Sequence, residues 1–189
     1  MHETLDQIRE DAARRLARAA SDRRSAMHTP VVATADADTR VMVLRAFEPW
    51  SLRFHTDSRA PKVAVIENDS RVGVLFYDRD EKIQLRLRGT ARIERDGPTA
   101  QAAWEAGDNF ARRCYLGDGP GSVSDAASSG LPDAFEGTRP TDAQLVPARA
   151  NFAVLLIEIE HLDWFHLAHD GHRRAQFDLA TGAARWVTP

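Results

Sequence analysis

Two basic residues near an expected helix start are the first whose spacing could do chemistry. Arg59 and Lys62 stand three positions apart, where residues 61–68 are expected to form a helix. Cations are disfavoured there, because a helix N-terminus already carries partial positive charge. A bound anion would remove this conflict, since free backbone N–H groups and the basic side chains would both face it. Together with Arg40 and Arg45, the pattern indicates a phosphate site, with ordinary surface charge as the alternative.

Arg40 and Arg45 lie at the two ends of an expected strand with the sequence RVMVLR, which includes Val41, Met42 and Val43. Side chains alternate along a strand, so positions five apart point to opposite faces unless a bulge intervenes. The two arginines therefore need not bind the same group.

Three other features contain residue types that could bind a ligand. Gln84 lies on the polar face of an expected strand, and its amide offers donors and acceptors that suit the edge of a flavin ring, although an exposed strand glutamine shows the same pattern. Cys114 is a candidate reactive thiol, with an ordinary half-buried cysteine as the alternative. A third group consists of residue types that can bind metals. The spacings of five, three and three between its histidines favour loop and edge positions, so we expect no metal. This group is His161, His166, His169 and His172, with Asp163 and Asp170.

Several common catalytic sequences do not occur in the chain. It contains no G-x-G-x-x-G, no Walker sequence, no H-E-x-x-H and no nucleophile elbow. The sequence therefore disfavours a Rossmann domain, a P-loop NTPase, a zinc protease of the H-E-x-x-H type and an α/β-hydrolase.

The N-terminal segment, residues 1–25, is expected to be helical over residues 4–24. Thr4 can cap this helix, apolar residues recur along one face, and arginines cover the other. The thin apolar stripe indicates a solvated helix packed on a domain edge rather than a membrane-surface helix. The apolar positions are Leu5, Ile8, Ala12, Leu16 and Ala19 or Ala20.

Short apolar or alternating runs dominate the rest of the chain. Residues 40–45 and 50–56, around a four-residue break, predict a hairpin, and residues 82–93 predict a long strand of period two. Many strands with few helices indicate a mainly β fold, a barrel or a sandwich. The other expected strands are 31–33, 71–77, 151–160, 161–169, 172–179 and 183–187, with a helix at 97–108 and a turn at 181–182.

Length and composition indicate one domain over residues 1–189. Residues 117–147 are rich in Gly, Pro, Ser and Asp and are expected to be a surface excursion. The net charge of -3 gives no drive toward nucleic acid or an anionic membrane. The single cysteine excludes an intramolecular disulfide and is typical of a reducing compartment. Because the charged N-terminus contains no apolar signal core, we expect a cytoplasmic protein that binds neither nucleic acid nor membrane.

An ordered series of short motifs resembles the pyridoxamine 5'-phosphate oxidase family, whose fold is the FMN-binding split β-barrel. No single motif is decisive, but their order and spacing together are specific. The resemblance covers residues 40–94 well and residues 151–189 more loosely. The motifs are RVMVLR at 40–45, FHTD at 54–57, SRAPK at 58–62, IENDSRV at 66–72, QLRLRG at 84–89, Trp164, RRAQF at 173–177 and WVTP at 186–189.

This resemblance implies an FMN site between the two chains of an obligate homodimer. Arg40 and the residues after it, Val41, Met42 and Val43, would line the phosphate and the ribityl chain. Arg59 and Lys62 would meet the phosphate, in agreement with the argument from the helix end.

The same resemblance implies which residues contact the ring. His55 and Thr56 would contact the flavin from one strand, and Gln84 would address the edge of the isoalloxazine. Trp164 and Arg174 would come from the second subunit and complete the site.

The chain also departs from the family pattern. Arg45 stands where the oxidases usually carry lysine, and this exchange is not neutral at a finely fitted site. Of the Tyr-x-x-x-Arg-x-x-x-Ser set for the substrate phosphate, the stretch NFARRCYLG at 109–117 keeps only Arg113. The Arg-x-His pair that follows the tryptophan in the oxidases does not occur in register in residues 164–172. These residues therefore support cofactor binding better than pyridoxamine phosphate oxidation.

The function expected from these residues is a flavin oxidoreductase that transfers a hydride through FMN. Arg45 and Arg113 would orient an anionic small-molecule substrate, for which a phosphorylated B6 vitamer is one candidate. A non-catalytic FMN carrier or sensor on the same fold is the first alternative, and a dimeric β-barrel without flavin is the second.

Overall fold

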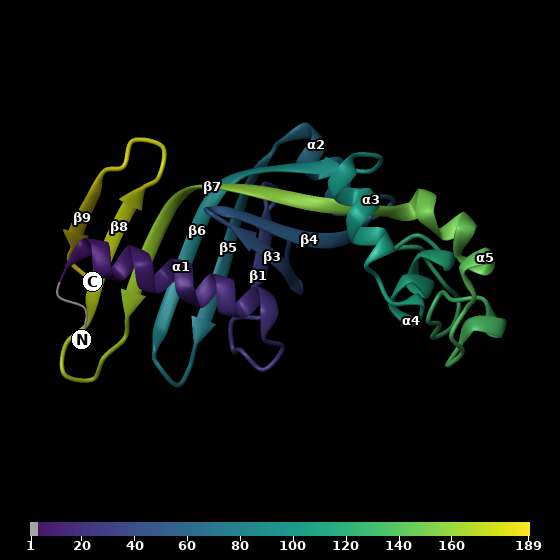
Figure 1. Ribbon diagram of the computed structural model, residues 1–189, viewed down its shortest axis with the longest axis horizontal. Coiled ribbons are helices and arrows are strands. Elements are labelled where there is room, and N and C mark those ends of the chain that lie inside the picture. Colours follow the sequence, from purple (N-terminus) through teal and green to yellow (C-terminus); the bar gives the residue numbers. More distant parts are fainter. Residues whose placement is uncertain (1–3) are drawn as a thin grey trace.

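The structure is a computed structural model that describes residues 4–189, so the first three residues of the predicted N-terminal helical segment lie outside it. Within this range nine strands form one antiparallel sheet in the order β2-β1-β5-β6-β7-β4-β3, with β8 paired to β7 and β9 paired to β8 (Figure 1). The prediction of a mainly β fold is confirmed. The strands are β1 Val31–Thr34, β2 Thr39–Val41, β3 Leu44–Glu48, β4 Ser51–Asp57, β5 Arg71–Asp78, β6 Ile83–Glu94, β7 Phe152–His166, β8 Arg173–Asp178 and β9 Ala184–Val187.

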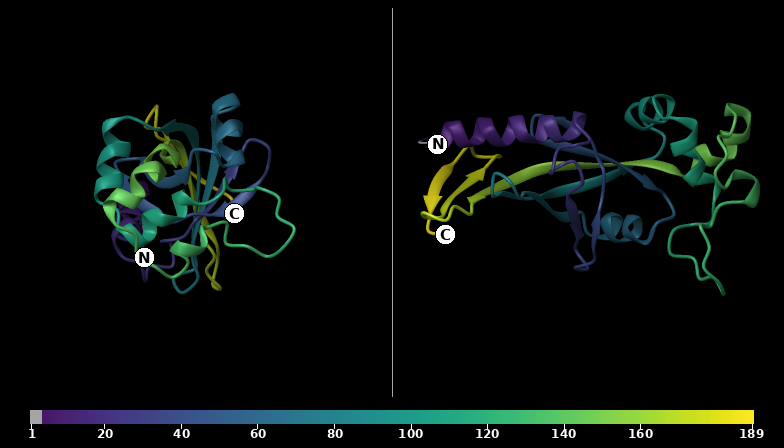
Figure 2. Two further views of the ribbon diagram at one scale, coloured as in Figure 1. Left: turned by 90° about the vertical axis from the view of Figure 1, so that its right-hand side faces the viewer. Right: turned by 90° about the horizontal axis from the view of Figure 1, so that it is seen from below.

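Helix α1 covers one face of the curled sheet (Figures 1 and 2). Thr4 caps it as predicted: its hydroxyl accepts a hydrogen bond from the Gln7 N–H at 3.2 Å. Ile8, Ala12 and Leu16 are fully buried in the main core, so α1 closes the core and is not an edge helix. The helices are α1 Leu5–Ser21, α2 Pro61–Asn68, α3 Pro98–Glu105, α4 Asn109–Arg112 and α5 Asp142–Leu145, with 3-10 helices η1 Arg113–Leu116, η2 Asp133–Phe135 and η3 Val146–Asn151.

The sheet has two faces that differ in burial. Along β6, Leu85 and Leu87 enter the main core together with α1, and we call this side the inner face. Gln84, Arg86 and Arg88 point to the opposite side, which we call the outer face, as the period-two pattern predicted. The outer face of this region is where polar side chains are available for binding.

The expected single strand at residues 40–45 is two strands. β2 ends at Val41, and the N–H groups of Met42 and Leu44 donate to the carbonyls of Pro30 and His28 instead of to the neighbouring strand. β3 then pairs with β4 through a tight turn at Trp50, whose φ is 64°. A hairpin is present, as predicted, but its first strand is Leu44–Glu48 rather than residues 40–45.

Strand β7 joins two segments that were predicted as separate strands, residues 151–160 and 161–169. Arg88 pairs with His161 and Gly89 pairs with Ile159, so Glu160 is the extra residue of a β-bulge. The bulge keeps the strand continuous although its alternation shifts by one position at this point. The sequence prediction was wrong here because a bulge and a strand end look alike in an alternation pattern.

Residues 117–147 form the predicted surface excursion at the end of the molecule opposite β8 and β9 (Figure 1). The expected helix at 97–108 is shorter, and ends as α3 at Glu105. Helix α3 and the segments after the excursion pack on the outer face near the start of β7, where Trp104, Leu145 and Phe152 form a second, smaller core. Within residues 4–189, no helix is long and apolar enough to cross a membrane.

Candidate functional site

The N-terminus of α2 is open to an anion. Ala60 is the N-cap and provides no side-chain hydrogen bond, Pro61 is the first helical residue, and the first turn contains no acidic residue. The N–H groups of this turn therefore lack the side-chain acceptor that usually satisfies them. A helix end of this kind binds phosphate readily.

Asp57 orients Arg59 just before this helix. The Nε of Arg59 lies 3.0 Å from Oδ1 of Asp57, and its Nη2 lies 2.8 Å from Oδ2. The backbone N–H of Arg59 also donates to Oδ1 at 2.8 Å. This pairing raises the pKa of Arg59 above its already high ordinary value. The guanidinium is thus fixed at the end of β4, with 34% of its side chain exposed.

Lys62 and Arg40 bring two more cations to the same helix end. Burial lowers the pKa of Lys62, and the charge of Arg40 lowers it further, although Asp57 and Asp38 oppose the change. Arg40 is positioned by Thr34, whose Oγ1 accepts from its two terminal nitrogens at 3.0 and 3.1 Å, and by an ion pair with Asp38. We call Arg40, Arg59, Lys62 and the first turn of α2 the cradle.

The donors of the cradle fit the phosphate of FMN. Three cations, Arg40, Arg59 and Lys62, lie near an uncapped helix N-terminus, and a phosphate would accept from the backbone and the side chains at once. Next to the cradle, Met42 is buried, Val43 is half-buried and Val41 is 65% exposed on the outer face. The charge of Arg40 acts on Lys62, while the assignment of Arg40, Arg59, Lys62 and residues 41–43 to the phosphate end stays a prediction.

His55 and Thr56 are neighbours on β4 but face opposite sides. Thr56 is buried, and its hydroxyl donates to the carbonyl of Asp57 at 3.3 Å. His55 lies on the outer face with its ring 5.1 Å from that of Phe152. Burial lowers the pKa of His55 to about 4, and the charges of Arg45 and Arg53 lower it too. The imidazole is neutral at pH 7.

Arg45 is the extra residue of a β-bulge in β3, between Leu44 and Ala46. A bulge was the one condition under which Arg45 and Arg40 could face the same side. Arg45 is exposed, whereas Arg40 is turned into the cradle. The charge of Arg45 acts on His55 and Tyr115, so it lies beside this aromatic part of the outer face.

Arg113 holds the excursion in place. Its Nη1 donates to the carbonyls of Phe135 at 3.3 Å and Thr138 at 3.4 Å, and its guanidinium lies 3.6 Å from the ring centroid of Phe110. Its expected role in orienting a substrate stays a prediction. Cys114 is exposed, and its thiol donates to the carbonyl of Ala111 at 2.8 Å.

Gln84 and Arg174 lie on either side of Phe165. In the register of the sheet, Phe165 pairs with Gln84 of β6 and with Arg174 of β8, so the three side chains share the outer face. We call this row the arm. Phe165 was missed in the sequence, although its place next to Trp164 would have indicated it once the strand face was known.

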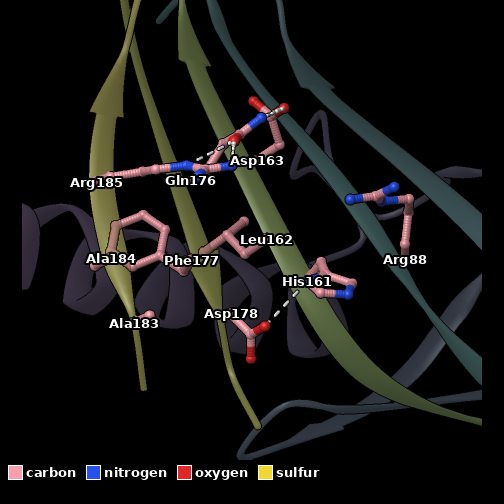
Figure 3. A pocket seen from close by; sticks show the side chains of 10 residues that line it. All are labelled: Arg88, His161, Leu162, Asp163, Gln176, Phe177, Asp178, Ala183, Ala184 and Arg185. Carbon is pink, nitrogen blue, oxygen red and sulfur yellow. Dashed lines mark hydrogen bonds and ion pairs between the residues drawn. The ribbon is translucent and has the colours of Figure 1, made fainter. Parts of the chain in front are cut away.

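Asp163 fixes the guanidinium of Arg174. Its carboxylate accepts from Arg174 Nε at 3.0 Å and Nη2 at 2.7 Å, and also from Arg86 at 2.8 Å and Gln176 at 3.0 Å. These donors keep the pKa of Asp163 below its ordinary value, although burial opposes the shift. Figure 3 shows Asp163 linked to Gln176, whose Oε1 in turn accepts from Arg185, and these residues line a hollow of about 280 Å³ over β6 to β9.

Trp164 points away from the arm. It is 2% exposed and packs in the main core, on the inner face. This packing does not favour the expected contact of Trp164 with a flavin, which stays a prediction. As for metals, no three His, Cys, Asp or Glu side chains among the described residues come together as a metal site. Of the histidines that the sequence analysis considered as metal ligands, His161 has its Nδ1 3.9 Å from Oδ2 of Asp178 (Figure 3).

The cradle and the arm occupy different ends of the sheet. Asp57, at the end of β4, pairs with Phe152, whereas the arm is centred on Phe165 of the same strand β7. Thirteen residues of strand separate the two positions, which corresponds to roughly 40 Å along the strand. Within one chain the end of β4 that precedes Arg59 is therefore far from the arm, whereas Arg40 is in register, through Val32, Val74 and Leu87, with Leu162, three residues from Phe165.

Comparisons with known proteins agree with this fold. Residues 10–95 match the family model described as pyridoxamine 5'-phosphate oxidase, FMN-binding domain, a range that includes the cradle and Gln84. A pyridoxamine 5'-phosphate oxidase-related, FMN binding protein from Nostoc punctiforme PCC 73102 is 21% identical, with a TM-score of 0.74 over 100% of both chains. A search of curated proteins gave no match.

Two further solved structures show the same fold at lower identity. PhzG from Burkholderia lata 383, solved with tetrahydrophenazine-1-carboxylic acid, is 16% identical, with a TM-score of 0.71 over 95% of this chain and 91% of that chain. A protein related to general stress protein 26 from Clostridium acetobutylicum is 11% identical, with a TM-score of 0.58 over 95% and 100%. Residues 10–95, just under half of the chain, thus match the family model of the pyridoxamine 5'-phosphate oxidase FMN-binding domain, and the fold is the split β-barrel of these solved structures.

Proposed function

We propose that the chain binds FMN with its phosphate in the cradle and is a flavin oxidoreductase. The observation that carries the proposal is the crowding of Lys62 and Arg40 at the uncapped N-terminus of α2. A phosphate carries close to two negative charges at pH 7 and would offset this crowding. The match of residues 10–95 to an FMN-binding domain supports the identity of the cofactor.

When bound, the flavin supplies the hydride chemistry, while the chain supplies orientation and electrostatics. Arg59 is held by Asp57 and needs little reorganisation to meet a phosphate. His55 stays neutral, so it adds one donor and one acceptor to the outer face without adding charge. Val41, Met42 and Val43 would line the cofactor between the phosphate and the ring.

A second copy of the chain would complete the site. Arg174 lies roughly 40 Å along β7 from the end of β4 that precedes Arg59, which is longer than a flavin. The outer face also leaves Val41, Leu75 and Tyr77 at 65%, 38% and 43% exposed. Apolar residues gathered on one exposed sheet face are typical of an interface. We therefore propose a homodimer in which the arm of one chain reaches the cradle of the other.

The substrate would be a small anion that meets Arg45 on its bulge. A phosphorylated B6 vitamer is one candidate, because residues 10–95 match the pyridoxamine 5'-phosphate oxidase family model. The carboxylic acid bound by PhzG makes an aromatic carboxylate another. Arg113 is already bonded to two carbonyls of the excursion. Arg45 is then the cation that remains for the substrate, which favours a substrate that needs a single cation.

A non-catalytic FMN carrier or sensor is the second proposal. It is favoured by the engagement of Arg113, because a side chain that holds the excursion is less available to a substrate. The two functions share the cofactor site and differ only in turnover. Reduction of the bound flavin by a nicotinamide cofactor, or turnover of a B6 vitamer, would favour the enzyme.

The test begins with the absorption spectrum of the purified protein before and after adding FMN. We expect a flavin spectrum and quenched flavin fluorescence on binding. Arg59→Glu should weaken FMN binding by about a hundredfold or more, since it places a negative charge beside the phosphate. Arg71→Glu is the matched control, because Arg71 pairs with Asp69 in the same way at the other end of α2. Colourless protein whose addition leaves flavin fluorescence unchanged would refute the proposal.

A further inference from the structure

The excursion contains a loop whose two ends are tied together. The N–H of Asp118 donates to the carbonyl of Gly130 at 2.9 Å. Gly117 lies so close to the same carbonyl that a Cβ on it would be 2.5 Å from the oxygen. Residues 118–130 therefore leave and return at one point, and the loop has a fixed base although most of it is exposed.

The first part of this loop lies on the entrance to α2. A Cβ on Gly119 would be 3.5 Å from Arg59 Cβ and 3.8 Å from Arg59 Nε. A Cβ on Gly121, whose φ is 90°, would be 3.3 Å from Pro61 Cγ. The N–H and hydroxyl of Ser122 donate to the Gly119 carbonyl at 3.1 and 2.7 Å and turn the chain back. We call residues 117–122 the strap.

Glycine allows the strap to approach closely. A Cβ at 119 would lie at ordinary van der Waals distance from Arg59, whereas one at 121 would be tight against Pro61, so the strap passes directly beside both residues. Asp118 lies near enough for its charge to act on Arg59. In the right-hand view of Figure 2 the excursion extends on the side of the molecule where α2 lies. The strap therefore lies beside Arg59 and Pro61 as part of a loop with a fixed base.

We infer that the strap closes the phosphate end of the cofactor site and restricts it to a cofactor that ends in a terminal phosphate. This inference rests on the proposed position of the FMN phosphate in the cradle. FMN ends at that phosphate, whereas FAD continues from it into an adenylate. The continuation would have to leave past Arg59 and Pro61, where Gly119 and Gly121 leave little more room than a methyl group. The strap must also move before bound FMN can dissociate.

The deciding experiment compares Gly121→Ala with Gly137→Ala. Both glycines lie in the excursion at positive φ, 90° and 70°, so alanine is strained at each. A Cβ at 137 meets nothing within 4 Å, whereas one at 121 meets Pro61 at 3.3 Å. Both variants would be titrated with FMN and with FAD by flavin fluorescence, and FMN release would be timed after dilution.

We expect wild type and Gly137→Ala to prefer FMN over FAD and to release FMN slowly. Gly121→Ala should release FMN about tenfold faster and lose about tenfold of its preference against FAD. A second variant replaces residues 119–129 by two glycines, which the tied base allows, and should bind both flavins with similar affinity.

The outcomes separate this inference from the proposed function. Wild type that binds FMN and FAD equally, or a Gly121→Ala variant that matches Gly137→Ala in both measurements, would overturn the strap while FMN binding stands. Retention of FMN preference after replacement of residues 119–129 would overturn it as well. Wild type that binds neither flavin would refute the proposed function, and the strap inference with it.

Discussion

Gly89 of β6 approaches Glu158 of β7 so closely that a Cβ on Gly89 would lie 1.8 Å from the Glu158 carbonyl oxygen. This contact lies directly beside the bulge at Glu160, where β7 shifts its register against β6. The bulge decides which side chains of β7 face outward beyond it, and these include Asp163 and Phe165 of the arm region. A glycine is required here by the close approach of two backbones.

Gly89→Ala should therefore destabilise the fold by about 2–4 kcal/mol, because backbone must move to admit the methyl group. Gly73→Ala is the matched control on the next strand, where the nearest atoms to a Cβ lie at 3.9 Å, and should change stability by less than about 1 kcal/mol. Urea denaturation of both variants measures the difference. Equal stabilities would mean that β6 and β7 separate easily at the bulge.

The two Asp-x-Arg pairs at the ends of α2 differ in burial and should differ in stability. Asp57 is 7% exposed in its side chain and Asp69 is 30% exposed, although each accepts from the backbone N–H and the guanidinium of an arginine two positions later. Asp57→Ala should cost about 1–3 kcal/mol, because it leaves partly buried donors unpaired. Asp69→Ala should cost less than Asp57→Ala, because exposed ion pairs contribute little to stability. Thermal denaturation of the two variants checks the order, which the opposite ranking would contradict.

The lowered pKa of His55 makes stability depend on pH. The folded protein keeps His55 neutral down to about pH 4, whereas the unfolded chain binds a proton near the ordinary value of 6.5. The unfolded state therefore binds more protons between these values, and stability falls as pH falls from about 6.5 to about 4. The loss from this residue is at most about 3 kcal/mol.

His55→Gln should flatten this pH dependence, measured as the unfolding free energy in urea at several pH values. His161→Gln is the control, since His161 is 42% exposed in its side chain. A pH profile that is the same in wild type and His55→Gln would show that His55 is not the group responsible.

Much of the fold was predictable because local patterns and long-range structure agree there. Three elements form the structure that their local sequence indicates. They are the capped helix α1, the helix Pro61–Asn68 and the period-two strand β6. The failures are at Arg45 and Glu160. Both are bulge residues, and a bulge breaks the alternation that identifies a strand, while the hydrogen bonds that restore it come from distant residues.

The candidate site divides in the same way. The cradle was predictable because Arg59 and Lys62 lie close to each other in sequence and at the start of one helix. The arm was only partly predictable, because the alternation of β7 shifts at a bulge and so conceals that Phe165, rather than Trp164, shares a face with Gln84 and Arg174. The contact of Gly119 with Arg59 has no local signal at all, since the two residues are joined only by the tertiary fold.

The proposed division of the site between two chains leads to a complementation test. Arg59→Glu damages the cradle but leaves the arm intact, and Arg174→Ala damages the arm but leaves the cradle intact. Neither homodimer should bind FMN as wild type does. A mixed dimer, however, contains one site in which the intact cradle of one chain meets the intact arm of the other.

Unfolding the two variants together and refolding them should therefore restore wild-type FMN affinity in about one quarter of the sites, since random pairing makes half of the dimers mixed and each has one intact site. The measurement is an FMN titration followed by flavin fluorescence, compared with the two variants refolded separately and then combined. If the cradle and the arm of a single chain served the same flavin, every site would contain one of the two defects, and mixing would restore nothing. The fraction of restored sites therefore reports directly on whether Arg174 acts across the dimer.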